Sequence, residues 1–96
     1  MKYFVVIEAL GPAWNHSLPM RQQEEWPKHA AFMDSLVAER FVLLGGPLGD
    51  DTRMLIVNAD VESAIEARLA ADPWMSMGLL RIAKIQPWQI LLGHID

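Results

Sequence analysis

Two short segments of the chain are apolar on both of their alternating faces. Residues 3–9 are aromatic or β-branched at positions 3–7, and residues 54–57 are likewise apolar throughout. Segments this short and this rich in strand-forming residues predict strands rather than helices. A strand that is apolar on both faces lies in the middle of a sheet, where it is covered on both sides. Two central strands therefore constrain how the rest of the chain can be arranged.

A first helix is expected between these strands. Pro27 is tolerated only in a first turn or at a kink, so the regular helix should begin near Glu25 or Trp26 and end around Arg40. Apolar side chains with helical spacing predict its inward face. This inward face comprises His29, Phe32, Met33, Leu36 and Val37.

A second helix is expected after the second central strand. Asp60 is a good N-cap for it, and Asp72 should end it, because the residue before Pro73 is biased out of the helical region. Its inward face comprises Val61, Ile65 and Leu69, supported by Ala64 and Ala71.

The two remaining strands show the features of sheet edges. Residues 41–44 begin one strand, which the Gly-Gly-Pro segment at 45–47 should interrupt before a hairpin turn at 49–52. Residues 79–92 form the other, with charged residues and a proline along it. The predicted fold is α+β: a ferredoxin-like β-α-β-β-α-β domain over 1–96, whose four-stranded antiparallel sheet has the order 4-1-3-2 along the chain.

One face of this predicted sheet has no cover of its own. Both right-handed crossovers place their helices on the same face, so the other apolar face of the central strands must meet something else. Apolar residues make up 52% of the chain and four are tryptophan, which is rich for a small monomer. A homodimer through the open sheet face, forming a dimeric α+β barrel, is the simplest expectation.

Charge and composition exclude several classes of partner. The formal net charge of −4 argues against binding to nucleic acid or to an anionic membrane surface. Cysteine is absent, so disulfides and thiolate chemistry are excluded. The apolar run at the N-terminus is too short for a signal peptide or a membrane span. We therefore expect a soluble, cytoplasmic protein.

His29 and Asp72 are the candidate catalytic residues. Histidine exchanges protons near neutral pH, which suits a general acid or base. A buried histidine bonded to a carbonyl and a turn-forming aspartate before proline are the structural alternatives. In this topology the start of the first helix and the end of the second lie at the same end of the fold. A carboxylate there would orient the imidazole and select its tautomer.

Aromatic and methionine residues surround this pair in the sequence. Such side chains line small-molecule sites, although they also close the core of small domains. A lone arginine such as Arg21 would offset the charge of an anionic substrate, or simply be solvated. The predicted substrate-binding residues are Trp14, His16, Arg21, Trp26, Trp74 and Met75.

Other kinds of site are not supported by the sequence. The three histidines lack the spacing of metal ligands, so no metal site is expected. The glycine-rich segment at 45–49 lacks the lysine and the following helix of a phosphate-binding loop. No serine lies in a nucleophile-elbow context. We expect no cofactor.

The chain resembles the YCII-related (YciI-like) family over nearly its whole length. The resemblance is carried by Tyr-Phe-Val-Val at 3–6, the His-Ala-Ala-Phe-Met run at 29–33, Gly-Gly-Pro-Leu at 45–48, Asp-Pro-Trp at 72–74 and Gln-Pro-Trp at 86–88. It implies a ferredoxin-like subunit in a dimeric α+β barrel, with a His-Asp pair, here His29 and Asp72, as the active site. One similar enzyme removes chloride from a chlorinated hydroxyhydroquinone without a cofactor.

Three functions follow as hypotheses. The first is a cofactor-independent enzyme, of lyase, dehydrochlorinase or isomerase type, that transfers protons on a small aromatic or enol-type molecule. The second is a non-catalytic module that binds a small ligand or serves dimerisation. The third is a cofactor-free monooxygenase, which only the barrel fold supports.

Overall fold

The computed structural model describes residues 2–95. Its elements, in chain order, are β1 (Tyr3–Leu10), η1 (Met20–Gln22), α1 (Trp26–Ala38), β2 (Val42–Leu48), β3 (Thr52–Asn58), α2 (Glu62–Leu69), α3 (Pro73–Ser76) and β4 (Leu80–Trp88). Within these residues no helix is both long and apolar enough to cross a membrane.

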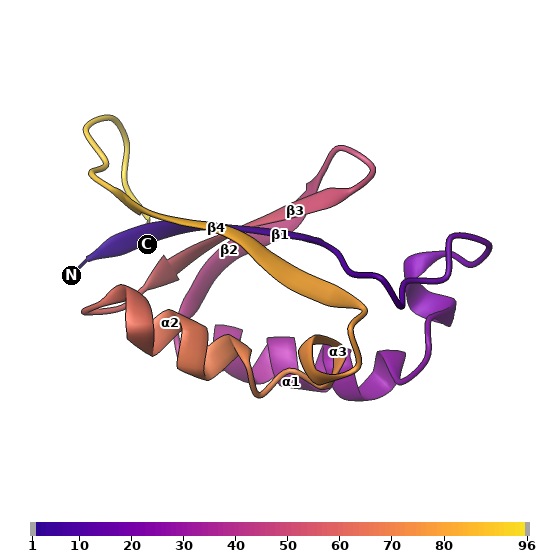
Figure 1. The fold of residues 1–96 in the computed structure, drawn as a ribbon. Coiled ribbons are helices and arrows are strands. Elements are labelled where there is room, and N and C mark those ends of the chain that lie inside the picture. Colours follow the sequence, from indigo (N-terminus) through magenta and orange to yellow (C-terminus); the bar gives the residue numbers. More distant parts are fainter. Residues whose placement is uncertain (1, 96) are drawn as a thin grey trace.

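The four strands form one antiparallel sheet in the order β2-β3-β1-β4. The two strands predicted to be central are central, and the fold is the ferredoxin-like α+β fold expected from the sequence. The three helices α1, α2 and α3 lie on the same side of the sheet (Figure 1). The predicted single covered face is therefore confirmed.

The core lies between the helices and this face of the sheet. Alternation along β1 sends Phe4 and Val6 toward the helices, and in β3 Leu55 and Val57 point the same way. The helices contribute buried leucine and isoleucine side chains, namely Leu36, Ile65 and Leu69. Glu8 is the next residue in the buried series of β1, and it is 0% exposed. A carboxyl group thus continues an apolar row.

Two predictions about the edge strands were wrong in detail. The Gly-Gly-Pro segment at 45–47 does not interrupt β2, which pairs with β3 as far as Leu48. An edge strand can accommodate proline, because its outward N–H needs no partner. The irregularity lies instead between Val42 and Leu44. At the other edge, β4 ends at Trp88 rather than continuing to residue 92.

The helix boundaries also differ from the sequence prediction. The N-cap of α2 is Val61, not Asp60, and Val61 is 53% exposed rather than inward. Val37 of α1 is 53% exposed as well, so the inward stripe ends at Leu36. Most importantly, α2 ends at Leu69, three residues before Asp72.

Gly11 holds the loop after β1 against the segment that precedes β4. Its N–H donates to the carbonyl of Leu79 at 2.8 Å, and the N–H of Ala13 donates to that of Gly78 at 2.9 Å. A Cβ atom on Gly11 would collide with the carbonyl oxygen of Gly78. This close backbone approach connects the loop bearing Trp14 to the rest of the domain.

We predict that Gly11→Ala lowers the free energy of unfolding by about 2 kcal/mol, since backbone atoms cannot move aside as a flexible side chain can. Urea unfolding followed by tryptophan fluorescence measures the change. Gly46→Ala is the matched control, because a Cβ on Gly46 meets nothing within 4 Å. Equal stability of the two variants would contradict the prediction.

Candidate active site

Asp72 begins a short helix instead of ending a long one. It is the N-cap of α3, and its Oδ1 accepts the N–H of Trp74 at 2.9 Å. Pro73 occupies the first turn of α3, where its missing N–H is not needed. The sequence interpretation that placed this carboxylate at the unfavourable C-terminal end of a helix was therefore wrong. An N-cap aspartate instead stabilises a helix.

His29 and Asp72 are in direct contact, as the topology predicted. The Nδ1 atom of His29 lies 3.0 Å and 2.8 Å from the two carboxylate oxygens of Asp72. On the opposite side of the ring, Nε2 lies 3.2 Å from Nη1 of Arg53. A guanidinium only donates, so Nε2 must carry the lone pair and Nδ1 the proton directed at Asp72. The contacts therefore select one tautomer of the imidazole.

Trp74 covers one face of the imidazole. The rings of His29 and Trp74 are stacked, with centroids 3.8 Å apart and planes inclined by 5°. Trp74 is itself 0% exposed, and its indole N–H donates to the carbonyl of Glu24 at 2.7 Å. A fixed, buried aromatic ring thus keeps water away from the His29–Asp72 pair.

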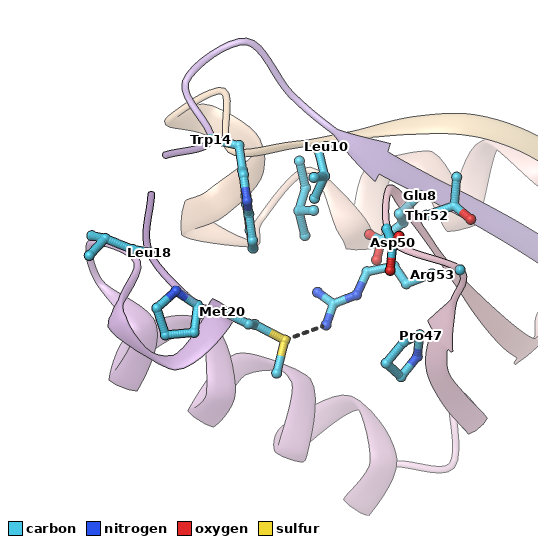
Figure 2. Close-up of a pocket in the computed structure, with 12 residues that line it drawn as sticks. Glu8, Leu10, Trp14, Leu18, Met20, Pro47, Asp50, Thr52 and Arg53 are labelled. Atoms are coloured by element: carbon cyan, nitrogen blue, oxygen red, sulfur yellow. Dashed lines mark hydrogen bonds between the residues drawn. The ribbon is translucent and has the colours of Figure 1, made fainter. Parts of the chain in front are cut away.

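Two cavities share Arg53, Met20 and Pro47 in their linings, and His29 lines one of the two. The cavity lined by Trp14, called here the Trp14 cavity, has a volume of about 360 Å³. The cavity lined by His29, called here the His29 groove, has a volume of about 410 Å³ and includes Trp26. In Figure 2 the side chain of Arg53 reaches across toward Met20, whose sulfur accepts from Nη2 at 3.2 Å. The side chain of Arg53 thus forms part of the wall of both cavities.

The loop that carries Trp14 is held in place by Gln23. This side chain is 3% exposed, and its amide nitrogen donates to the carbonyls of Asn15 and Leu18 at 2.7 Å and 3.0 Å. Its amide oxygen accepts the N–H of Asn15 at 3.1 Å. A buried glutamine thus supplies the hydrogen bonds that an irregular loop cannot supply for itself.

Glu8 is the most unusual ionisable group near the site. It lines the Trp14 cavity, yet neither of its carboxyl oxygens has a hydrogen-bond partner. Burial raises the pKa of the Glu8 carboxyl from 4.5 to about 7, and the negative charge of Asp72 adds to the rise. The Arg53 guanidinium acts against it. Glu8 therefore exchanges a proton near neutral pH.

The predicted substrate-binding residues are dispersed. Trp14 and Trp26 line different cavities, with Trp74 buried between them and in ring contact with both. Trp74 and Met75 line neither cavity. His16 and Arg21 are exposed and also line neither, so the cation beside the imidazole is Arg53 instead. A substrate-binding role for these residues stays a prediction.

Arg53 and Glu8 escaped the sequence interpretation. They are opposite each other in the pairing of β1 with β3, and each is a charged residue at a strand position facing the helices. Their sequence signal is a pair of opposite charges at one register position of two otherwise apolar central strands. Reading it requires the strand register, which the sequence pattern alone did not supply.

The fold and site define an α+β protein of the ferredoxin-like class in which the histidine of a buried Asp-His pair lines a cavity. No family model and no curated protein matches the chain. Among solved structures, it is similar to 5-chloro-2-hydroxyhydroquinone dehydrochlorinase (TftG) from Burkholderia phenoliruptrix AC1100, in complex with 2,5-dihydroxybenzoquinone. The TM-score is 0.63 at 23% identity, over 95% of each chain. This likeness establishes the fold.

We predict that Glu8→Gln removes a pH-dependent loss of stability. Between pH 4.5 and about 7 the folded protein holds a proton that the unfolded chain has released, so wild-type stability falls as pH rises through this window. A rise of one pKa unit corresponds to about 1.4 kcal/mol, so the variant should gain about 3 kcal/mol on wild type by pH 8, and almost nothing near pH 4.5.

Urea unfolding at both pH values measures this difference. Glu66→Gln, at an exposed position of α2, is the control and should show no such pH-dependent gain. A Glu8→Gln difference that is the same at both pH values would contradict the prediction.

Proposed function

We propose that this protein is a cofactor-independent enzyme in which His29 transfers a proton on a small aromatic or enol-type molecule and Asp72 orients it. The observation that carries the proposal is the buried contact between the two side chains, at 2.8 Å, with the imidazole lining a cavity. Asp72 would also stabilise the imidazolium that forms when His29 accepts a proton.

The reaction type that suits this arrangement is an elimination or an isomerisation. In an elimination, Nε2 of His29 would accept a proton from the substrate. The electron pair left behind would form a new double bond, and the leaving group would depart with its own bonding pair. In an isomerisation the proton would return to a different atom. A general base of this kind contributes about 10²–10⁴-fold in rate.

Two further points support this class of chemistry. The structurally similar dehydrochlorinase is an enzyme of this reaction type, and its complex contains a small hydroxylated quinone. The motifs at 29–33 and 72–74 also resemble the YCII-related family, in which we place the chain as part of this proposal.

The contact between Arg53 and Nε2 favours a second function. The nitrogen that would accept a proton is 3.2 Å from a guanidinium, which blocks it while the contact lasts. In a non-catalytic binding module, Asp72 and His29 would serve only to hold Arg53 toward a ligand. In the enzyme, Arg53 must release Nε2 when the substrate enters.

The two functions are separated by following both binding and turnover. Hydroxylated benzenes and quinones, including the chlorinated hydroxyhydroquinone named above, are titrated into ¹⁵N-labelled protein. Chloride release and deuterium uptake from D₂O are then measured for each compound that binds. We expect turnover of at least one compound, and a rate reduced at least a hundredfold in His29→Gln because the base is lost.

Asp72→Asn and His94→Gln complete the design. Asp72→Asn should shift the ring proton of His29, as reported by the ¹⁵N shifts of the imidazole, whereas His94→Gln, at an exposed position, should leave turnover unchanged. Binding near His29 without turnover would establish the binding module instead. Failure of every compound to bind would exclude the aromatic or enol-type class.

We also propose that the open sheet face pairs with a second copy of the chain. The strand register places Leu44, Leu48 and Trp88 on the face opposite the helices, and they are 58%, 48% and 43% exposed. Between them lie the outward residues of the central strands, including Tyr3 and Val5. A self-complementary partner would remove this apolar surface from water.

Light scattering during size-exclusion chromatography tests the dimer. Wild type should elute with twice the mass of the chain, and Leu44→Glu should shift it toward the monomer by placing a charge in the interface. Val61→Glu, an exposed apolar position beside α2, is the control and should remain dimeric. A monomeric wild type would rule out the proposed assembly.

A further inference from the structure

Glu8 and Arg53 carry opposite charges at one register position, and the proposed proton transfer does not use Glu8. They face each other across β1 and β3, and both line the Trp14 cavity. Arg53 is half-buried and directs Nη1 to His29 and Nη2 to the sulfur of Met20. Glu8 is fully buried behind it with no hydrogen-bond partner.

Arg53 retains donors for a ligand. Its two contacts use two of the five N–H donors of a guanidinium, and a thioether sulfur is only a weak acceptor. A charged oxygen would be a much better partner for Nη2 than the sulfur is. The walls of the Trp14 cavity are mostly apolar and include one aromatic ring. The large apolar side chains among them are Leu10, Trp14, Leu18, Met20 and Leu80.

We propose that the Trp14 cavity binds an aromatic ring bearing an ionised oxygen, a phenolate, enolate or carboxylate, on Arg53, and that Glu8 takes up a proton as this anion binds. The ring lies against Trp14 and the leucines, while the oxygen accepts from the guanidinium. Glu8 acts through Arg53 and does not touch the ligand, so it is a positioning residue that sets the charge of the site.

The proton uptake follows from reciprocity. The positive charge of Arg53 is what keeps the carboxylate form of Glu8 accessible in a buried position. An anion on Arg53 offsets that charge, so the protonated form of Glu8 becomes more favourable. Thermodynamic linkage then requires that protonated Glu8 favour the anion by the same factor. The low dielectric of the cavity wall strengthens this coupling.

Other charged groups near Glu8 act in a known direction. Asp72 and an ionised Asp50, which lines the same cavity, disfavour the carboxylate form of Glu8 and an anionic ligand alike. His29 donates its Nδ1–H to Asp72 and accepts from Arg53 at Nε2. On β4 the residue paired with Glu8 is the uncharged Ile82. Glu8 is thus a carboxyl group opposite Arg53 whose pKa burial raises to about 7.

The experiment measures binding of benzoate, which stays ionised between pH 6 and pH 8.5, by NMR titration of the whole chain. We expect the affinity of wild type to fall at least tenfold across this range as Glu8 becomes ionised. Glu8→Gln should keep the tight affinity of low pH throughout, and Arg53→Gln should bind weakly at every pH. Arg81→Gln, at an exposed arginine, is the control and should behave as wild type.

Calorimetry of wild type in two buffers of different ionisation enthalpy supplies a second readout that needs no variant. Near pH 7.5 it should detect uptake of a substantial fraction of one proton for each benzoate bound. No uptake, the same pH dependence in Glu8→Gln, or no benzoate binding would each overturn the proposal. Benzyl alcohol, the neutral ring, should bind without pH dependence.

This inference rests on the proposed function in one respect, because the ligand that it names would be the class of substrate for the proposed enzyme. Binding and proton uptake are measured without turnover. If they are observed and no compound is turned over, the enzyme proposal fails and the anion site stands. If turnover depends on His29 but benzoate binding is the same in Glu8→Gln, the enzyme proposal stands and the anion-site proposal fails.

Discussion

The candidate site depends on the hydrogen bonds that the Asp72 carboxylate accepts. It caps α3 by accepting the N–H of Trp74, and it accepts the Nδ1 proton of His29. The same two oxygens therefore position both the stacked indole and the imidazole. Burial of Asp72 at 0% exposure is tolerated because each oxygen is hydrogen-bonded. Replacing it with alanine would remove both the cap of α3 and the contact that selects the His29 tautomer.

A row of polar side chains extends from Asp72 through the site. Asp72 holds His29, the imidazole holds Arg53, and Arg53 is paired in register with Glu8. Two aspects of the sheet make this possible: β1 and β3 are neighbours, and alternation directs both charged side chains to the helix face. A polar network has therefore been built into one end of an apolar core. A buried polar network lowers stability unless its groups are hydrogen-bonded. Both carboxyl oxygens of Glu8 lack such a partner.

Because the site has two cavities, its tryptophans do not line a single pocket. Trp14 and Trp26 belong to different walls, and Trp74 belongs to the core between them. The His29 groove offers the imidazole, whereas the Trp14 cavity offers Glu8 and an apolar wall. Arg53 lines both cavities, and it also donates to Nε2 of His29.

Much of this protein could be predicted from its sequence alone. Apolar residues on both faces of residues 3–7 and 54–57 required two central strands, and the strand order, the covered face and the approach of His29 to Asp72 followed from chirality and topology. The apolar pattern of a strand is local, and the handedness of a crossover follows a general rule. The tertiary structure alone decided that Asp72 caps a new helix and that Arg53 meets the imidazole. These depend on where α2 ends and on how two strands are registered, and neither leaves a periodic signal in the sequence, because each is set by packing between residues far apart in the chain.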